Sequence, residues 1–334
     1  MDKIKSALAR LRPSKAALLS SAAALMIILL LTDPAAYLQS ALDSLTLFAL
    51  SAAPALFPFF FFSGLITRLG GAEKAGALFK KPAKLLYNAP AAGGYVWCMS
   101  VLSGYPTGAK LTGELCAGGA ISKAAARGIC AFTSTSGPLF IVGTVATAMF
   151  SAPEAGWILL AVNFAAALIN GFFYRSKNGE ETGQAVKPLK MRPSAALTQS
   201  MSAALASLLT VGGYMVVAGI AADALVNTGA IPALARLLAP LWGGEELAQG
   251  VLIGLIEVTK GANSIARAGA DIYSTLPALS FILAFGGLSV IAQSLSFLSP
   301  CGMGAGRLLR IKLTQSLAAL VLALILTVAI NAFS

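Results

Sequence analysis

The chain has 334 residues, of which 57% are hydrophobic and 11% are charged, with a net charge of +11 and no histidine. A soluble domain carries about 25% charged residues, so this composition leaves too little charge for a soluble surface and predicts an all-α integral membrane protein. Without histidine the chain forms no Ser-His-Asp triad, Cys-His dyad or histidine-ligated metal site, and we expect no enzyme activity, no metal and no cofactor.

The apolar runs predict about seven transmembrane helices, because a membrane-spanning helix needs about 20 mostly apolar residues. The first run, 16–31, follows a basic arm and resembles a signal peptide, but no clear cleavage site follows it. We therefore expect it to be retained, within an N-terminal unit 1–32. The longer runs cover 42–67, 129–150, 156–174, 197–222, 276–298 and 313–333.

Two further apolar segments, 91–103 and 247–257, are too short to cross and end in helix-breaking clusters at 103–108 and 258–263. Short apolar runs of this kind are typical of re-entrant segments, which enter and leave the membrane on one side. Non-helical backbone at that depth is tolerated where protein or a water-filled cavity covers it. We predict two re-entrant helical hairpins, at 91–117 and 247–270.

The basic residues give the chain an orientation, because short loops rich in Lys and Arg stay in the cytoplasm. When the predicted spans alternate, all of the 24 basic residues fall on one side except Lys110, Arg236, Lys260 and Arg267. This places the N-terminus in the cytoplasm and the C-terminus on the opposite side. The net charge is then an orientation signal, and we expect no nucleic-acid partner.

The two halves of the chain follow one plan. Residues 41–174 and 196–334 each contain a span, a hairpin and two further spans, and the polar stretch 175–195 reads as a cytoplasmic linker. Each unit crosses an odd number of times, so the second is inserted upside down. Inverted-topology repeats with broken helices at matching positions are typical of secondary transporters with a site near the membrane midplane.

Candidate binding residues surround the break of the first hairpin. Lys110 and the following half-helix N-terminus suit an anionic group of a ligand, and ionisable residues inside a membrane are functional candidates by default. The alternative is an ion pair between Lys110 and Glu114, one helical turn apart. The substrate-binding candidates here are Ser103, Tyr105, Thr107 and Lys110, with Glu114 as a coupling-ion candidate.

The second hairpin carries a matching set. Glu257 ends an apolar run and is either paired with Lys260 or a ligand for substrate or a coupling cation. Thr259, Lys260 and Asn263 complete the substrate-binding candidates at this break.

A third group of candidates interrupts the run 129–150. Thr133, Ser134, Thr135 and Ser136 precede Gly137-Pro138, where an unwound stretch exposes hydroxyls and carbonyls that suit Na⁺ or a polar ligand. The alternative is hydroxyl bonding to the backbone of a helix kinked at the proline. The corresponding break at Gly286-Gly287 is more apolar and offers Gln293 as a coupling-ion candidate.

Several of these motifs carry a family resemblance. The segments 102–111 (LSGYPTGAKL), 121–123 (ISK), 134–141 (STSGPLFI), 254–261 (GLIEVTKG) and 285–289 (FGGLS) resemble the YlbJ-type sporulation integral membrane proteins. That family belongs with proteins carrying a nucleoside-recognition gate domain and is similar in plan to concentrative nucleoside transporters. The resemblance implies a role in endospore formation and movement of dipicolinic acid across a cell or forespore membrane.

The leading hypothesis is a transporter or facilitator of a small organic anion, dipicolinate, that works by alternating access around two opposed hairpins. The alternatives are a nucleoside-type solute, for which Tyr105, Asn263 and Gln293 offer stacking and amide groups, and a non-transporting sporulation membrane component. The expected partners are the lipid bilayer, the anion and a coupling cation, Na⁺ or H⁺. A homo-oligomer is left open.

Overall fold

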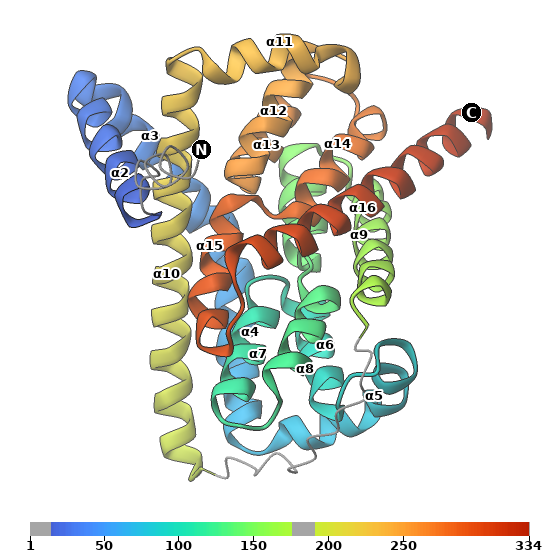
Figure 1. Ribbon diagram of the computed structural model, residues 1–334. Coiled ribbons are helices and arrows are strands. Elements are labelled where there is room, and N and C mark those ends of the chain that lie inside the picture. The colour runs from blue at the N-terminus through green and yellow to red at the C-terminus, as the bar shows by residue number, and fades with distance from the viewer. Residues whose placement is uncertain (1–14, 176–190, 334) are drawn as a thin grey trace, which may run out of the picture.

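The computed structural model describes residues 15–175 and 191–333, and every regular element in these ranges is a helix, as the composition predicted (Figure 1). The first half contains α2 (Lys15–Thr32), α3 (Pro34–Leu47), η1 (Phe48–Ala52), α4 (Ala53–Arg68), α5 (Gly71–Tyr87), α6 (Ala91–Ser103), α7 (Thr107–Ala117), α8 (Lys123–Thr133), η2 (Leu139–Met149) and α9 (Pro153–Phe173). The second half contains α10 (Pro193–Asn227), α11 (Ala230–Trp242), α12 (Glu245–Ile256), α13 (Val258–Arg267), α14 (Ile272–Phe285), α15 (Gly287–Leu298), η3 (Ser299–Cys301) and α16 (Ala305–Phe333).

Five stretches of the described residues are helical, long and apolar enough to cross a membrane. They are Pro34–Arg68, Pro153–Phe173, Pro193–Asn227, Ile272–Cys301 and Ala305–Ile330. Their outer faces are apolar, as with Leu209 on α10 and Val328 on α16, which are 71% and 68% exposed. Side chains of this kind suit contact with lipid tails, so five of the predicted runs form helices of membrane-spanning character.

The run 129–150 forms two short helices instead of one span. α8 ends at Thr133, residues 134–137 are not helical, and the π-helix η2 begins at Leu139. Pro138 has no N–H to donate and restricts the residue before it to extended backbone, which stops the helix there. The run therefore supplies the predicted interruption, but it is not one of the membrane-spanning helices.

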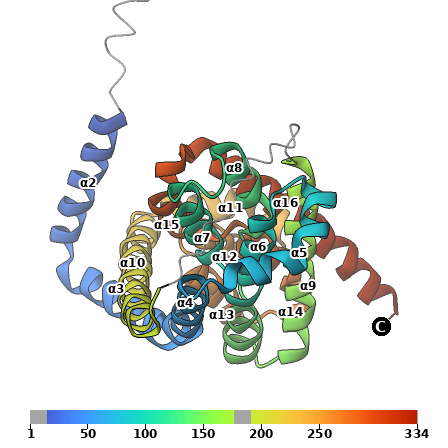
Figure 2. The same cartoon turned by 90° about the horizontal axis from the view of Figure 1, so that it is seen from below.

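The first predicted span lies apart from the bundle. Figure 2 looks along α10 and shows α2 lying across that direction, with α3 leading back to α10. Residues 1–14 of the predicted N-terminal unit lie outside the described residues, as do residues 176–190 of the predicted linker. The number of crossings that the sequence predicts, and the crossing by α2 in particular, therefore remain predictions.

The order of elements repeats between the halves. A long helix (α3 to α4, or α10) is followed by an amphipathic helix (α5 or α11), then by short helices and a final long helix (α9 or α16). In Figure 1, α5 lies at the level of the lower end of α10, on the other side of the bundle, and α11 lies at the upper end of α10. An inverted repeat requires this kind of placement, and the inversion itself remains a prediction.

A buried amide joins three of the helices around the centre. Asn170 of α9 donates from Nδ2 to the carbonyl oxygens of Ala131 (3.0 Å) and Ile311 (3.1 Å), and its Oδ1 accepts from the Thr314 hydroxyl at 2.7 Å. Polar side chains that bond between helices hold membrane proteins together where the hydrophobic effect is weak. This network holds α16 against the interrupted α8–η2 pair.

Candidate functional site

Four helix interruptions in the described part of the chain meet at the centre of the protein. They separate α6 from α7, α8 from η2, α12 from α13, and α14 from α15. The break between α6 and α7 touches the break between α8 and η2, because the Tyr105 N–H donates to the Thr135 carbonyl at 2.6 Å. The α8–η2 break also reaches the end of α14, where the Ser136 hydroxyl donates to the Leu283 carbonyl at 3.1 Å. Residues from both halves of the chain therefore build one centre.

Two glycines allow these breaks to approach closely. Gly104 has φ +78°, and a Cβ there would overlap the backbone nitrogen of Gly137. Gly287 has φ +80°, and a Cβ there would come within 2.9 Å of the Ile256 carbonyl oxygen and 3.1 Å of the Val258 nitrogen. Only glycine adopts this backbone conformation at low cost and also leaves room for a neighbouring chain.

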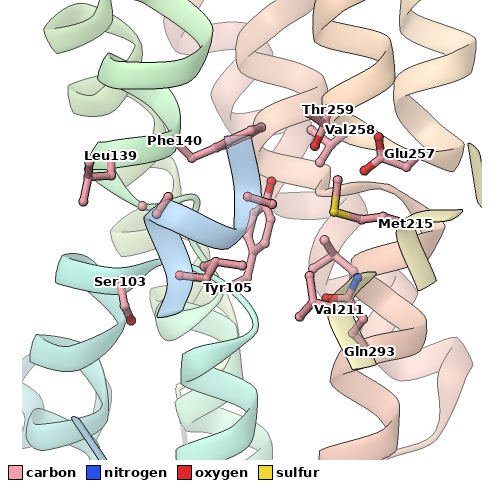
Figure 3. Close-up of a pocket in the computed structure, with 15 residues that line it drawn as sticks. Ser103, Tyr105, Leu139, Phe140, Val211, Met215, Glu257, Val258, Thr259 and Gln293 are labelled. Carbon is pink, nitrogen blue, oxygen red and sulfur yellow. The ribbon is translucent and has the colours of Figure 1, made fainter. Parts of the chain in front are cut away.

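A cavity of about 530 Å³, counting space that opens to the outside, lies beside these breaks (Figure 3). Apolar side chains form most of its wall, including residues of α10 and both π-helical regions. π-Helical turns are rare and occur frequently at functional sites. Five sequence-predicted site residues line the cavity: Ser103, Tyr105, Glu257, Thr259 and Gln293.

The Tyr105 hydroxyl is the most direct sign of a ligand. Tyr105 is 9% exposed, and its hydroxyl lies near the Ser136 side chain without a hydrogen bond of normal geometry to any of the described residues. Figure 3 shows the ring between Phe140 on one side of the cavity and Glu257 on the other. A buried hydroxyl without a well-formed hydrogen bond is costly, so this group is available to a solute or water in the cavity.

Glu257 lines the cavity and also starts α13. Its carboxylate accepts the Lys260 backbone N–H at 2.7 Å, and its backbone is extended, as expected of an N-cap residue. The Lys260 ammonium instead pairs with Asp223 of α10 and lies 3.4 Å from the Gly219 carbonyl. The predicted alternative of an ion pair between Glu257 and Lys260 is therefore wrong, because Asp223 takes the ammonium.

The ion pair between Asp223 and Lys260 joins α10 to α13, with side chains that are 28% and 16% exposed. We expect Asp223→Asn to lower the free energy of unfolding by about 1–3 kcal/mol, because it leaves a partly buried ammonium without its carboxylate. Adding Lys260→Gln should restore most of the loss. Thermal unfolding in detergent measures both.

The exposed pair of Arg236 and Glu245, with side chains 73% and 46% exposed, is the matched control. Glu245→Gln should change the free energy of unfolding by less than about 1 kcal/mol. Equal losses for the Asp223 and Glu245 variants would show that α10 and α13 do not depend on the inner pair.

Other candidates of the hairpins lie outside the cavity wall. Lys110 is 8% exposed, with its ammonium 5.2 Å from the Phe60 ring centroid, a cation–π distance. Glu114 is exposed, and no ion pair joins it to Lys110 in the described part of the chain. The Thr107 hydroxyl is buried without a partner there, and Asn263 is half-buried.

The four hydroxyl residues before Gly137-Pro138 are all buried and bonded within the protein. Thr133 donates to the Ile129 carbonyl at 2.8 Å, as the kinked-helix alternative predicts, and Thr135 donates to the Ser100 carbonyl at 3.4 Å. Ser134 accepts a hydrogen bond from Lys312. None of the four lines the cavity, so they shape its wall instead of forming its surface.

Sequence reasoning missed Lys312. The charge pattern assigned it to the cytoplasmic group with Arg307 and Arg310, yet it is 1% exposed, while those two arginines are exposed. The signal in the sequence is its position inside the apolar stretch Ala305–Ile330, followed by Thr314 and Gln315.

The fold and the cavity define an integral membrane protein whose interrupted helices meet around a central cavity. The chain is similar to the sporulation integral membrane protein YlbJ of Bacillus subtilis (strain 168), with 26% identity over 299 residues that cover 80% of this chain and 72% of that protein. No family model and no solved structure matches the chain. The wider likeness to gate-domain proteins and concentrative nucleoside transporters therefore remains a prediction.

Proposed function

We propose that this protein carries a small solute across a membrane of a spore-forming bacterium. The observation that supports this is the central cavity, whose wall combines helix breaks from both halves of the chain. Broken helices around a central site are the usual construction of secondary transporters. The segments 91–117 and 247–270 act as opposed re-entrant hairpins that expose the cavity to each side in turn.

The chemistry of the wall favours a small planar aromatic solute. Tyr105 offers a ring face and a hydroxyl, Gln293 offers an amide, and Thr259 offers a hydroxyl, within a wall that is otherwise mainly apolar. Ligand sites commonly combine an apolar surface with a few polar groups of this kind. Dipicolinate, a planar ring with two carboxylates, is the leading substrate, and the likeness to a sporulation protein supports it.

The charge of the wall sets a condition on that substrate. Glu257 lines the cavity, but no lysine or arginine of residues 15–175 and 191–333 does. Two carboxylates in one enclosed site repel each other unless one holds a proton. The anion therefore binds when Glu257 is protonated, so the coupling ion is H⁺ and not Na⁺. Gln293 helps to hold the bound solute through its amide group. Lys110 is buried next to Phe60 and does not line the cavity.

A nucleoside-type solute is the second candidate. The lining residues that the structure describes include no lysine or arginine, which favours it, because a neutral base and sugar need no cation and no proton on Glu257. Tyr105 and Gln293 are available for stacking and amide hydrogen bonds, whereas Asn263, the third predicted partner, does not line the cavity.

Thermal unfolding of the purified full-length protein with dipicolinate or nucleosides, with and without Na⁺, separates these candidates. Stabilisation by dipicolinate supports the leading substrate, and stabilisation by nucleosides supports the second. If neither binds and neither is moved into liposomes, the protein is a non-transporting sporulation component and the proposal fails. Uptake that requires Na⁺ would contradict proton coupling.

Tyr105→Phe should weaken dipicolinate binding about tenfold or more without loss of folded protein. Within the protein the hydroxyl gives up only a weak contact with the Ser136 side chain, whereas a hydrogen bond to a charged ligand contributes about 1.5–3 kcal/mol. Tyr273→Phe, outside the cavity wall, is the control. Unchanged affinity in the Tyr105 variant would remove this hydroxyl from the site.

A further inference from the structure

Lys312 is a buried cation surrounded by neutral oxygen atoms. Its ammonium lies 3.0 Å from the Ser134 carbonyl oxygen, 3.2 Å from the Ser134 hydroxyl and 3.5 Å from Oε1 of Gln315. The side chain is 1% exposed, and no carboxylate pairs with it in the described ranges. An ammonium has three donors, and these three acceptors match them.

Two of the three acceptors, the carbonyl and hydroxyl oxygens of Ser134, belong to the interrupted stretch between α8 and η2. Ser134 follows the last residue of α8, where the helix leaves carbonyl oxygens without helical partners. Gln315 lies three residues after Lys312 on α16, and its Nε2 donates to the same Ser134 carbonyl at 3.0 Å. A cluster of carbonyl, hydroxyl and amide oxygens is the ligand type that hard cations prefer.

We propose that this stretch is a monovalent-cation site whose resident cation is the tethered ammonium of Lys312. The sequence predicts Na⁺ or a polar ligand at these hydroxyls and carbonyls, but the ammonium of Lys312 on α16 occupies the oxygen atoms of Ser134. A dissolved cation is then not needed to stabilise the non-helical stretch between α8 and η2. The inference concerns Lys312 and its oxygen ligands and does not depend on which solute the protein carries, or on whether it carries one.

The tethered charge also supports the wall of the central cavity. The Lys312 ammonium lies 5.4 Å from the ring centroid of Tyr105, within cation–π range. The next residue of the interrupted stretch, Thr135, accepts the Tyr105 backbone N–H. Loss of the ammonium therefore leaves the oxygen cluster without its cation and loosens the segment that positions Tyr105.

Replacement of the ammonium by a dissolved cation tests the proposal. The full-length protein and Lys312→Met are extracted and unfolded thermally in choline, sodium, potassium or ammonium chloride at one ionic strength. We expect the wild-type midpoint to be the same in all four salts. The variant should unfold several degrees lower in choline, and a small cation should restore it in a saturable way. Lys123→Met, at an exposed lysine, is the control.

Lys312→Ala is the second variant, because its shorter side chain leaves room for propylammonium, which resembles the end of the lysine side chain. Recovery of folded protein with propylammonium but not with choline supports the site. Three results overturn the proposal. The first is a wild-type unfolding midpoint that depends on Na⁺, and the second is the same unfolding midpoint for Lys312→Met and its control Lys123→Met in every salt. The third is failure of every small cation to raise the midpoint of either Lys312 variant. Uptake is not measured, so failure of the transport proposal leaves this test intact.

Discussion

Glu257→Gln is expected to remove the pH dependence of dipicolinate binding. In the wild type, the anion shares the cavity with Glu257, so binding should weaken about tenfold for each pH unit above the pH at which this carboxyl group loses its proton. Glutamine carries no charge at any pH, so the variant should bind with one affinity over the pH range in which dipicolinate stays a dianion. Isothermal titration or ligand-dependent unfolding across a pH series measures the effect.

The variant should also remain folded. The Glu257 side chain caps α13 by accepting the Lys260 N–H, and the glutamine carbonyl oxygen is able to accept the same bond. Glu246→Gln, at an exposed position on α12, is the control and should keep the wild-type pH dependence. A pH dependence that survives in the Glu257 variant would place the proton elsewhere, and pH-independent binding in the wild type would favour a neutral solute.

Gly287→Ala is expected to abolish folding, or to lower the unfolding midpoint further than Asp223→Asn does. The new Cβ would lie 2.9 Å from the Ile256 carbonyl oxygen, a backbone atom of the neighbouring hairpin. The positive φ of +80° adds about 1–3 kcal/mol for a residue with a side chain. Recovery of monodisperse protein and thermal unfolding in detergent report the loss.

Gly269→Ala separates the two causes. Gly269 has φ +73°, but a Cβ at this position would meet no atom of the described residues within 4 Å. This variant should show the cost of the conformation alone, about 1–3 kcal/mol. Equal losses for the two glycines would mean that the breaks do not press against each other as closely as the structure shows.

Much of the fold follows from local properties of the chain. Apolar stretches of membrane-spanning length stay helical because lipid offers no partner for backbone groups, so the runs within Pro193–Asn227 and Ala305–Ile330 were predictable. The interruption before Pro138 was predictable from the adjacent pair Gly137-Pro138, whereas a single proline such as Pro277 lies inside a helix. The sequence also marked residues that line the cavity, such as Tyr105 and Glu257, because they stand at helix breaks inside apolar surroundings.

Pairing between distant residues was not predictable in the same way. Glu257 and Lys260 are close in the sequence, yet the lysine pairs with Asp223, because α10 and not its own helix faces the ammonium. The same holds for α2, whose composition suits a membrane helix but whose position depends on packing. A residue's partners depend on which helices become neighbours, and no local pattern contains that information.

By itself, the sequence determined that this is a helical membrane protein with interrupted helices, because hydropathy and helix breaking act over a few turns of chain. Only the tertiary structure decided which of its few charged side chains are buried at the central helix breaks. Arg307, Arg310 and Lys312 look alike as a basic cluster. Burial and the oxygen atoms of Ser134, far away in sequence, separate Lys312 from the others.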